Sequence, residues 1–149
     1  RGAPGKALAA IRPVIGAHST ASEVIEEGYA LAIEAAFTLG DEAAMGELEA
    51  VVAVLPRARA TAMLRAGRAR LNAEIAHRRG DADAADRAEN EAITLLRSVG
   101  AQPLLGRALE ERAGRREDPE ALDEARAIYT ELGATRWLAR LHDSSGVPA

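Results

Sequence analysis

Two stretches of the sequence, Val99-Gly100-Ala101-Gln102-Pro103-Leu104-Leu105 and Leu132-Gly133-Ala134-Thr135-Arg136-Trp137-Leu138, follow one pattern at an offset of 33 residues. The same offset also aligns three further pairs of identical residues: Glu91 with Glu124, Ala92 with Ala125, and Arg107 with Arg140. A repeat of roughly this length that contains two helices indicates a stack of antiparallel helix pairs. These two stretches are therefore the starting point for predicting the fold.

The rest of the chain also predicts an all-α protein. Ala, Leu, Arg and Glu, which favour helices, are abundant, and aromatic residues make up only 3%. No segment alternates apolar and polar residues with the period of a β-strand. We expect about seven to eight helices, over residues 6–11, 20–39, 42–54, 59–79, 82–99, 103–113, 119–132 and from 135 onward.

Residues that begin or end helices set these boundaries. Thr20 and Glu23 have the spacing of a capping box. Glycine follows helices at Gly40-Asp41 and Gly80-Asp81, and Asp118-Pro119 has the form of an N-cap followed by proline at the first helical position. We expect a polar loop over residues 114–117, and we expect Thr135 to cap the last helix.

The residues resemble tetratricopeptide repeats. Gly80-Asp81 followed by Ala82 resembles the family's turn, and Leu105-Gly106 resembles the pair in its first helix. Further matches are Gly40-Asp41, the terminating Pro56, and Ala92, Ala125, Tyr129 and Leu132 in second helices. An ankyrin repeat has a similar length, but its Thr-Pro-Leu-His motif is absent.

The resemblance implies a superhelix of helix pairs, in which residues 1–142 form one helical-repeat domain. Residues 1–18 would be the remnant of a preceding repeat, and the three pairs would cover residues 19–56, 57–100 and 101–142. Residues 143–149 would be a flexible tail. The half-pair at the start predicts a fragment of a longer stack, which could self-associate.

Residues 80–101 and 124–138 resemble, more narrowly, the C-terminal helical region of large actinobacterial-type signalling proteins. In those proteins a signalling ATPase accompanies a class III adenylyl or guanylyl cyclase domain or a LuxR-type DNA-binding domain. The ATPase and cyclase motifs are absent from this chain. The resemblance therefore implies a non-catalytic, cytoplasmic protein-interaction or regulatory module of a bacterial signal-transduction protein, which binds a peptide or a neighbouring domain.

Two alternatives to this function stay open. The chain could be a structural spacer or dimerisation element without a ligand. It could also be a sensor domain that binds a small effector between its helices, for which an apolar cavity above roughly 300 Å³ would be needed.

Composition and spacing exclude several other classes of site. The formal net charge of −4 gives no reason to expect nucleic-acid binding, and the absence of cysteine excludes disulfides and thiolate metal sites. No apolar run approaches the roughly 20 residues of a membrane span. His18, His77 and His142 are far apart, without a metal-ligand spacing, and Gly2 to Ala7 departs from a phosphate loop. We therefore expect no metal, cofactor or catalytic residue.

Charge is distributed unevenly along the chain. Residues 21–56 contain eight acids and no Lys or Arg, whereas residues 57–79 contain seven Arg and one acid, Glu74. One interpretation is intramolecular, because helices of opposite charge attract each other. The other is a binding groove for an acidic partner, whose family-derived positions on this helix are Arg70, Glu74, His77 and Arg78.

Trp137 is the only tryptophan of the chain. An exposed tryptophan often marks a binding hot spot. At the end of a helical stack it more often covers the last apolar face, and we expect Trp137 to be such a cap.

Overall fold

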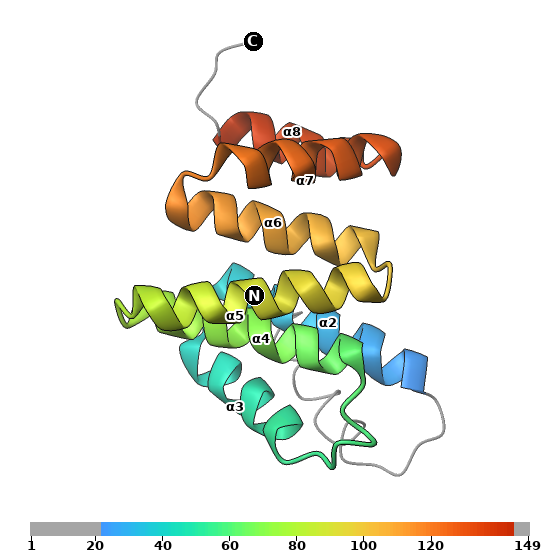
Figure 1. Ribbon diagram of the computed structural model, residues 1–149, viewed down its shortest axis with the longest axis vertical. Coiled ribbons are helices and arrows are strands. Elements are labelled where there is room, and N and C mark those ends of the chain that lie inside the picture. Colours follow the sequence, from blue (N-terminus) through green and yellow to red (C-terminus); the bar gives the residue numbers. More distant parts are fainter. Residues whose placement is uncertain (1–21, 145–149) are drawn as a thin grey trace. The chain divides into compact units, whose positions relative to one another are not determined.

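The computed structural model describes residues 22–144, and its side chains are described from Ile25 to Leu141. This part of the chain contains seven α-helices and no strand, as the sequence predicts (Figure 1). The helices are α2 (Ser22–Leu39), α3 (Glu42–Ala53), α4 (Ala62–Arg78), α5 (Ala82–Ser98), α6 (Gln102–Arg116), α7 (Pro119–Glu131) and α8 (Thr135–Ser144). None of these described helices is long and apolar enough to cross a membrane.

The same glycine turn ends four of the helices. After α5, Gly100 adopts φ +67°, and the amide of Ala101 donates to the carbonyl oxygen of Leu96 at 3.1 Å. This six-to-one hydrogen bond defines the Schellman motif, which favours glycine because a Cβ disfavours positive φ. The turns at Gly40, Gly80 and Gly133 have the same conformation and hydrogen bonds. The predicted helix ends at these glycines are therefore confirmed.

Short polar side chains cap the beginnings of four helices, α3, α4, α5 and α7. Asp41 accepts a hydrogen bond from the amide three residues later at 3.0 Å, Asp81 at 2.9 Å and Asp118 at 3.0 Å. Thr61 caps α4 in the same way at 3.3 Å. Each cap satisfies an amide that would otherwise lack a helical partner. The predicted N-cap at Asp118 is confirmed.

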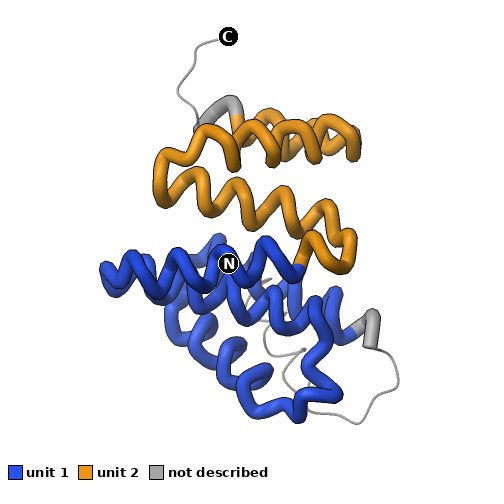
Figure 2. Tube along the Cα trace, viewed as in Figure 1, with its two compact units in different colours: residues 1–95 blue, residues 96–149 orange. Residues whose placement is uncertain are grey.

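The chain forms two compact units, Arg1–Leu95 and Leu96–Ala149, and the boundary falls inside α5 (Figure 2). In unit 1, α4 packs against both α2 and α3. Their shared core contains Ile25, Tyr29, Ala32, Ile33, Ala36, Ala44, Met45, Leu48, Val52, Leu64 and Leu71. The first predicted helix pair is thus covered by α4 within unit 1.

Small residues let the helices of unit 1 approach closely. Gly67 of α4 lies against Tyr29 of α2, and a Cβ at Gly67 would be 2.7 Å from the ring. The Tyr29 hydroxyl donates to the carbonyl oxygen of Leu48 at 3.0 Å, which connects the ring to α3. Burial is the main reason that the pKa of Tyr29 lies far above its usual value, and the charge of Glu49 adds to it. Tyr29 is therefore a neutral hydrogen-bonded wedge between three helices.

In unit 2, α6 and α7 form a tight pair, and α8 packs against α7. The backbone of Gly106 lies against the ring of Tyr129, which is fully buried. Leu105 and Ala125 are buried beside them, whereas Leu132 remains 46% exposed. The small and aromatic residues that resemble a repeat thus lie at the α6–α7 interface, but Leu132 lies outside it.

Three predicted boundaries are wrong. Helix α4 begins at Ala62 after the Thr61 N-cap, and not at residue 59. Helix α6 does not end at residue 113 but continues through Gly114 to Arg116, and it ends at Glu117 in the left-handed conformation. One exposed glycine costs a helix only about 1 kcal/mol, which is too little to end it. Thr135 is the first residue of α8, and the carbonyl oxygen of Ala134 accepts the first helical hydrogen bonds. The predicted helix at residues 6–11 and the capping box at Thr20 lie outside the described residues.

Candidate functional site

Arg70, the first of the predicted groove residues, is buried inside unit 1. It is 2% exposed, and its Nη2 donates to Oε1 of Glu34 in α2 at 2.5 Å. Its guanidinium also lies over the ring of Phe37, 5.5 Å from the ring centroid, within cation–π range. Arg70 therefore joins α4 to α2, as the intramolecular interpretation of the charge pattern describes.

Glu74, His77 and Arg78 lie further along α4, towards the turn between α2 and α3. Arg78 donates from Nε to Oε1 of Glu74 at 2.7 Å, and from Nη1 to the carbonyl oxygen of Gly40 at 3.4 Å. His77 is exposed. The structure thus brings Glu74 and Arg78 together as an ion pair, in which Arg78 also covers the end of α2.

A second cation of α4 pairs with the acidic part of the chain. Nε of Arg68 lies 2.7 Å from Oε1 of Glu49 in α3, and the two side chains are 41% and 24% exposed. Pairs with this exposure contribute about 0.2–1 kcal/mol. Together with the Arg70–Glu34 pair, this contact connects α4 to both acidic helices of unit 1.

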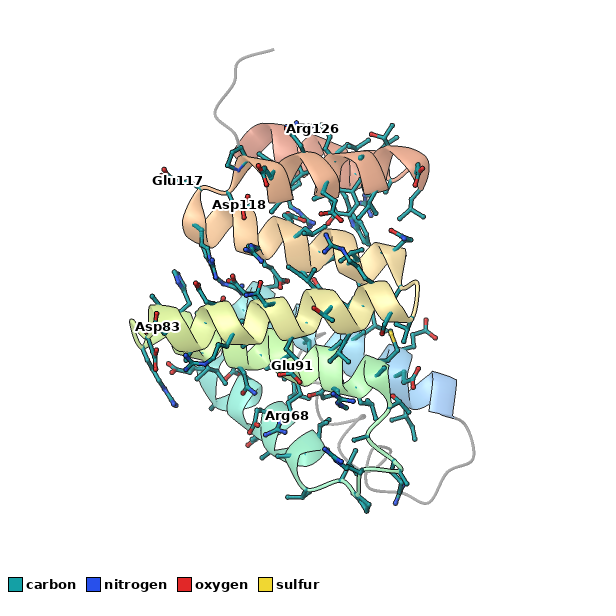
Figure 3. The ribbon with its side chains drawn as sticks, in the orientation of Figure 1. Arg68, Asp83, Glu91, Glu117, Asp118 and Arg126 are labelled. Atoms are coloured by element: carbon teal, nitrogen blue, oxygen red, sulfur yellow. The ribbon has the colours of Figure 1, made fainter. Side chains whose placement is uncertain are left out.

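One side of α4, together with its C-cap, carries four residues that we name the cationic strip: Arg65 and Arg79, which are exposed, and Arg68 and Asn72, which are half-buried. Their spacing of three, four and seven residues keeps them on one side of an α-helix. The neighbouring sides hold two apolar stripes, with Leu64, Gly67 and Leu71 on one and Ala66, Ala69 and Ala73 on the other, all buried. Figure 3 labels Arg68, the member of the strip that also pairs with Glu49.

The side chains of Arg65 and Arg79 form no ion pair within the described part of the chain. None of these four residues is among the groove positions that the resemblance implies, which are Arg70, Glu74, His77 and Arg78. The apolar stripes leave two polar sides on α4, and the strip lies on the one opposite Glu74.

Unit 2 contains a network of charged residues around Glu110. Its Oε1 accepts from Nε of Arg140 at 2.8 Å, and its Oε2 accepts from Nη2 of Arg140 at 2.9 Å, from Nη1 of Arg107 at 2.8 Å and from the Tyr129 hydroxyl at 2.8 Å. The network therefore connects α6, α7 and α8 through one carboxylate. In the sequence, the two arginines of this network are marked by the 33-residue offset that aligns Arg107 with Arg140.

The shifted pKa values in this network keep Glu110 charged and Tyr129 neutral. Burial alone would raise the pKa of Glu110, but the hydrogen bonds from Arg140 and the charge of Arg107 outweigh it, so the pKa lies below its usual value. Burial, followed by the charge of Glu110, raises the pKa of Tyr129 far above its usual value. A fully ionised glutamate held by two arginines is suited to joining helices rather than to transferring protons.

Trp137 packs against the same tyrosine. The rings of Trp137 and Tyr129 meet edge to face, with centroids 4.9 Å apart and an interplanar angle of 68°. Trp137 is half-buried, and Leu141 in the same helix is 2% exposed. Helix α8 thus covers the apolar side of α7 with these two residues.

The turn between α6 and α7 holds a further ion pair, Arg112 with Asp118, whose Nε and Oδ2 lie 3.0 Å apart. The backbone hydrogen bond from Ala121 is the main reason that the pKa of Asp118 is lowered, and Arg112 contributes to it. Figure 3 labels Asp118 and the neighbouring Glu117, whose φ is +53°. In the described residues, no three His, Asp or Glu side chains converge on a point where a metal ion could bind.

Comparison with known proteins gives no relative. No protein-family model matches the chain, and no match is found among curated proteins or solved structures. The function is therefore argued from the residues and the structure.

Proposed function

We propose that this chain is a non-catalytic interaction or regulatory module of a larger bacterial signal-transduction protein. The observation that carries the proposal is the cationic strip: Arg65 and Arg79 are exposed and form no ion pair within the described residues, while the apolar sides of α4 are buried in unit 1. Charged residues that serve only packing are expected to face partners in the fold, as Arg70 does. Exposed arginines without such partners suit recognition of another protein.

The resemblance to tetratricopeptide repeats supports the same function. Proteins built from stacked helix pairs offer extended surfaces to partners, because each pair contacts only its neighbours. The repeated glycine turns and the Gly106–Tyr129 contact suit such a stack. The superhelix, the cytoplasmic location and the accompanying cyclase, ATPase or DNA-binding domain are parts of this proposal.

The alternative is a spacer or dimerisation element. Its supporting observation is that many charged side chains of the two units form intramolecular pairs, among them Arg70–Glu34 in unit 1 and Arg97–Glu124 in unit 2. A spacer needs rigidity, and such pairs add to the rigidity of helix contacts.

The test begins with the coding sequence upstream of the codon for Arg1, where we expect a cyclase, ATPase or DNA-binding domain. That domain is produced separately and titrated calorimetrically with residues 1–149. Binding with Kd below about 100 µM is expected for an interaction module, within the range of weak transient complexes. If there is no binding, and deleting the helical segment leaves the output of the whole protein unchanged, the spacer alternative is correct.

A further inference from the structure

The cationic strip has the dimensions of a short linear binding site. Arg65 lies in the first turn of α4 and Arg79 is its C-cap, 14 positions later, which corresponds to about 21 Å at 1.5 Å per residue. Arg68 and Asn72 lie between them on the same side. An extended peptide advances about 3.3 Å per residue, so about seven residues would span the strip.

No acid of α4 itself lies on the same side as the strip. Glu74, the only acid between residues 57 and 79, lies nine residues after Arg65, and at 100° per residue it is therefore on the opposite side of α4. There it pairs with Arg78. The strip thus offers the guanidinium groups of Arg65 and Arg79, unpaired within the described residues, and the Asn72 amide, together with Arg68, which Glu49 of α3 already holds.

The rest of the chain restricts what can bind there. The net charge is −4, and residues 21–56, which form the other two helices of the unit 1 core, contain eight acids and no base. A nucleic acid extends its negative charge well beyond 21 Å, and the net negative charge of the chain disfavours such a partner. A short acidic segment of a protein can contact the strip alone, and guanidinium groups bind carboxylates through two parallel hydrogen bonds.

We propose that the strip formed by Arg65, Arg68, Asn72 and Arg79 binds an acidic segment of a partner protein, about seven residues long. The inference rests on the proposed function and names the chemistry of the partner. Arg65 and Arg79 bind carboxylates at the two ends of the segment, and the Asn72 amide donates to its backbone or side chains. Because the site is exposed, binding weakens steeply as salt increases.

The experiment uses the whole chain, residues 1–149, and a fluorescein-labelled oligoglutamate of about eight residues, the length that spans the strip. Fluorescence anisotropy measures its binding at about 50 mM and 500 mM salt, which correspond to long and short screening lengths. The test variant is Arg65→Glu with Arg79→Glu. The matched control is Arg126→Glu with Arg136→Glu, which changes the net charge equally on α7 and α8 of unit 2. Circular dichroism confirms that both variants are helical.

We expect the strip variant to bind the peptide at least about tenfold more weakly, the control to change by about twofold or less, and binding to be lost at high salt. Equal losses in both variants, or equal binding of an oligoglutamine peptide, would overturn the inference. So would no binding at low salt. Salt-sensitive self-association that the strip variant abolishes would identify a second copy as the occupant instead. If the attached domain binds while the oligoglutamate does not, the acidic-segment inference fails and the proposed function stands.

Discussion

Replacing Gly106 by alanine should destabilise unit 2, although the same change usually stabilises a helix. Alanine in a helix interior is favoured over glycine by about 1 kcal/mol. At Gly106, however, the new Cβ would lie 2.5 Å from Cε1 of Tyr129 and 3.1 Å from Cδ1 and Cζ. Carbon atoms in contact are normally separated by about 3.5–4.0 Å, so the ring or the helix must move by about 1 Å.

Tyr129 cannot move this far without losing other contacts. Its hydroxyl is bonded to Glu110 at 2.8 Å, its ring meets Trp137 at 4.9 Å, and its side chain is fully buried. Overpacking costs about 1–3 kcal/mol, and a weakened hydrogen bond adds about 1 kcal/mol. After subtraction of the gain in helix propensity, we expect Gly106→Ala to lower the free energy of unfolding by about 2 kcal/mol.

Gly114 provides a control in the same helix. It is exposed, and a Cβ there would meet no atom within 4 Å, so Gly114→Ala should stabilise α6 by about 0.5–1 kcal/mol. Urea titration followed by Trp137 fluorescence measures both variants, because the only tryptophan lies in unit 2 against Tyr129. We expect the midpoint to fall by about 1–2 M for Gly106→Ala. A midpoint at or above that of the wild type would refute the argument.

Further changes concern three residues of the α6–α7 turn and the Glu110 network, and the same fluorescence titration measures the stability of each variant. Glu117→Gly should stabilise unit 2 by about 0.5–1 kcal/mol. The left-handed conformation at φ +53° costs a non-glycine residue about 1–2 kcal/mol, and glycine removes this cost but loses more conformational entropy on folding. Asp118→Ala should destabilise it by about 1 kcal/mol through loss of the N-cap. The pKa of Asp118 is lowered in the folded state, so the contribution of its charge to stability is present above about pH 4 and is lost as pH falls through the folded pKa. In acid, the stability of the wild type should therefore approach that of Asp118→Asn. Tyr129→Phe should lower the free energy of unfolding by about 1 kcal/mol. It should also move the acid transition of Glu110 to higher pH, since it removes one hydrogen bond that lowers the pKa of Glu110. An unchanged acid transition would contradict the role of the hydroxyl.

The helix boundaries could be predicted where their cause is local. Gly40 and Gly80 end helices through hydrogen bonds that reach only five residues back, and Asp118 begins α7 through an amide three residues ahead. The end of α6 could not be predicted in this way. Gly114 looks like a breaker in sequence, but its weak preference against helix is overcome, and the helix instead stops near Pro119, where the residue before a proline avoids the helical conformation.

The faces of α4 were harder to predict than its length. Apolar residues form two stripes along α4, and the residues named above on both stripes are buried, as expected for a helix with neighbours on two sides. Which way the polar residues point depends on the rotation of the helix about its axis. The fit of Tyr29 against Gly67 fixes that rotation, and it places Arg70 against Glu34 while Arg65 faces outward. This fit involves residues 38 positions apart, which periodicity alone does not relate.

One pair of variants can distinguish an arginine of α4 that stabilises the fold, Arg70, from one that is available to a partner, Arg65. Arg70→Ala removes a buried cation and leaves Glu34 without this ion pair, which costs about 3–5 kcal/mol when both charges are fully buried. Because Glu34 is 29% exposed and keeps part of its hydration, we expect about 2–3 kcal/mol, measured as faster hydrogen exchange of the α2 amides. Arg65→Ala should change stability by less than about 0.5 kcal/mol, as exposed substitutions usually do. Equal acceleration of exchange in both variants would mean that Arg65 also serves packing, and the charge pattern would then have a purely intramolecular origin.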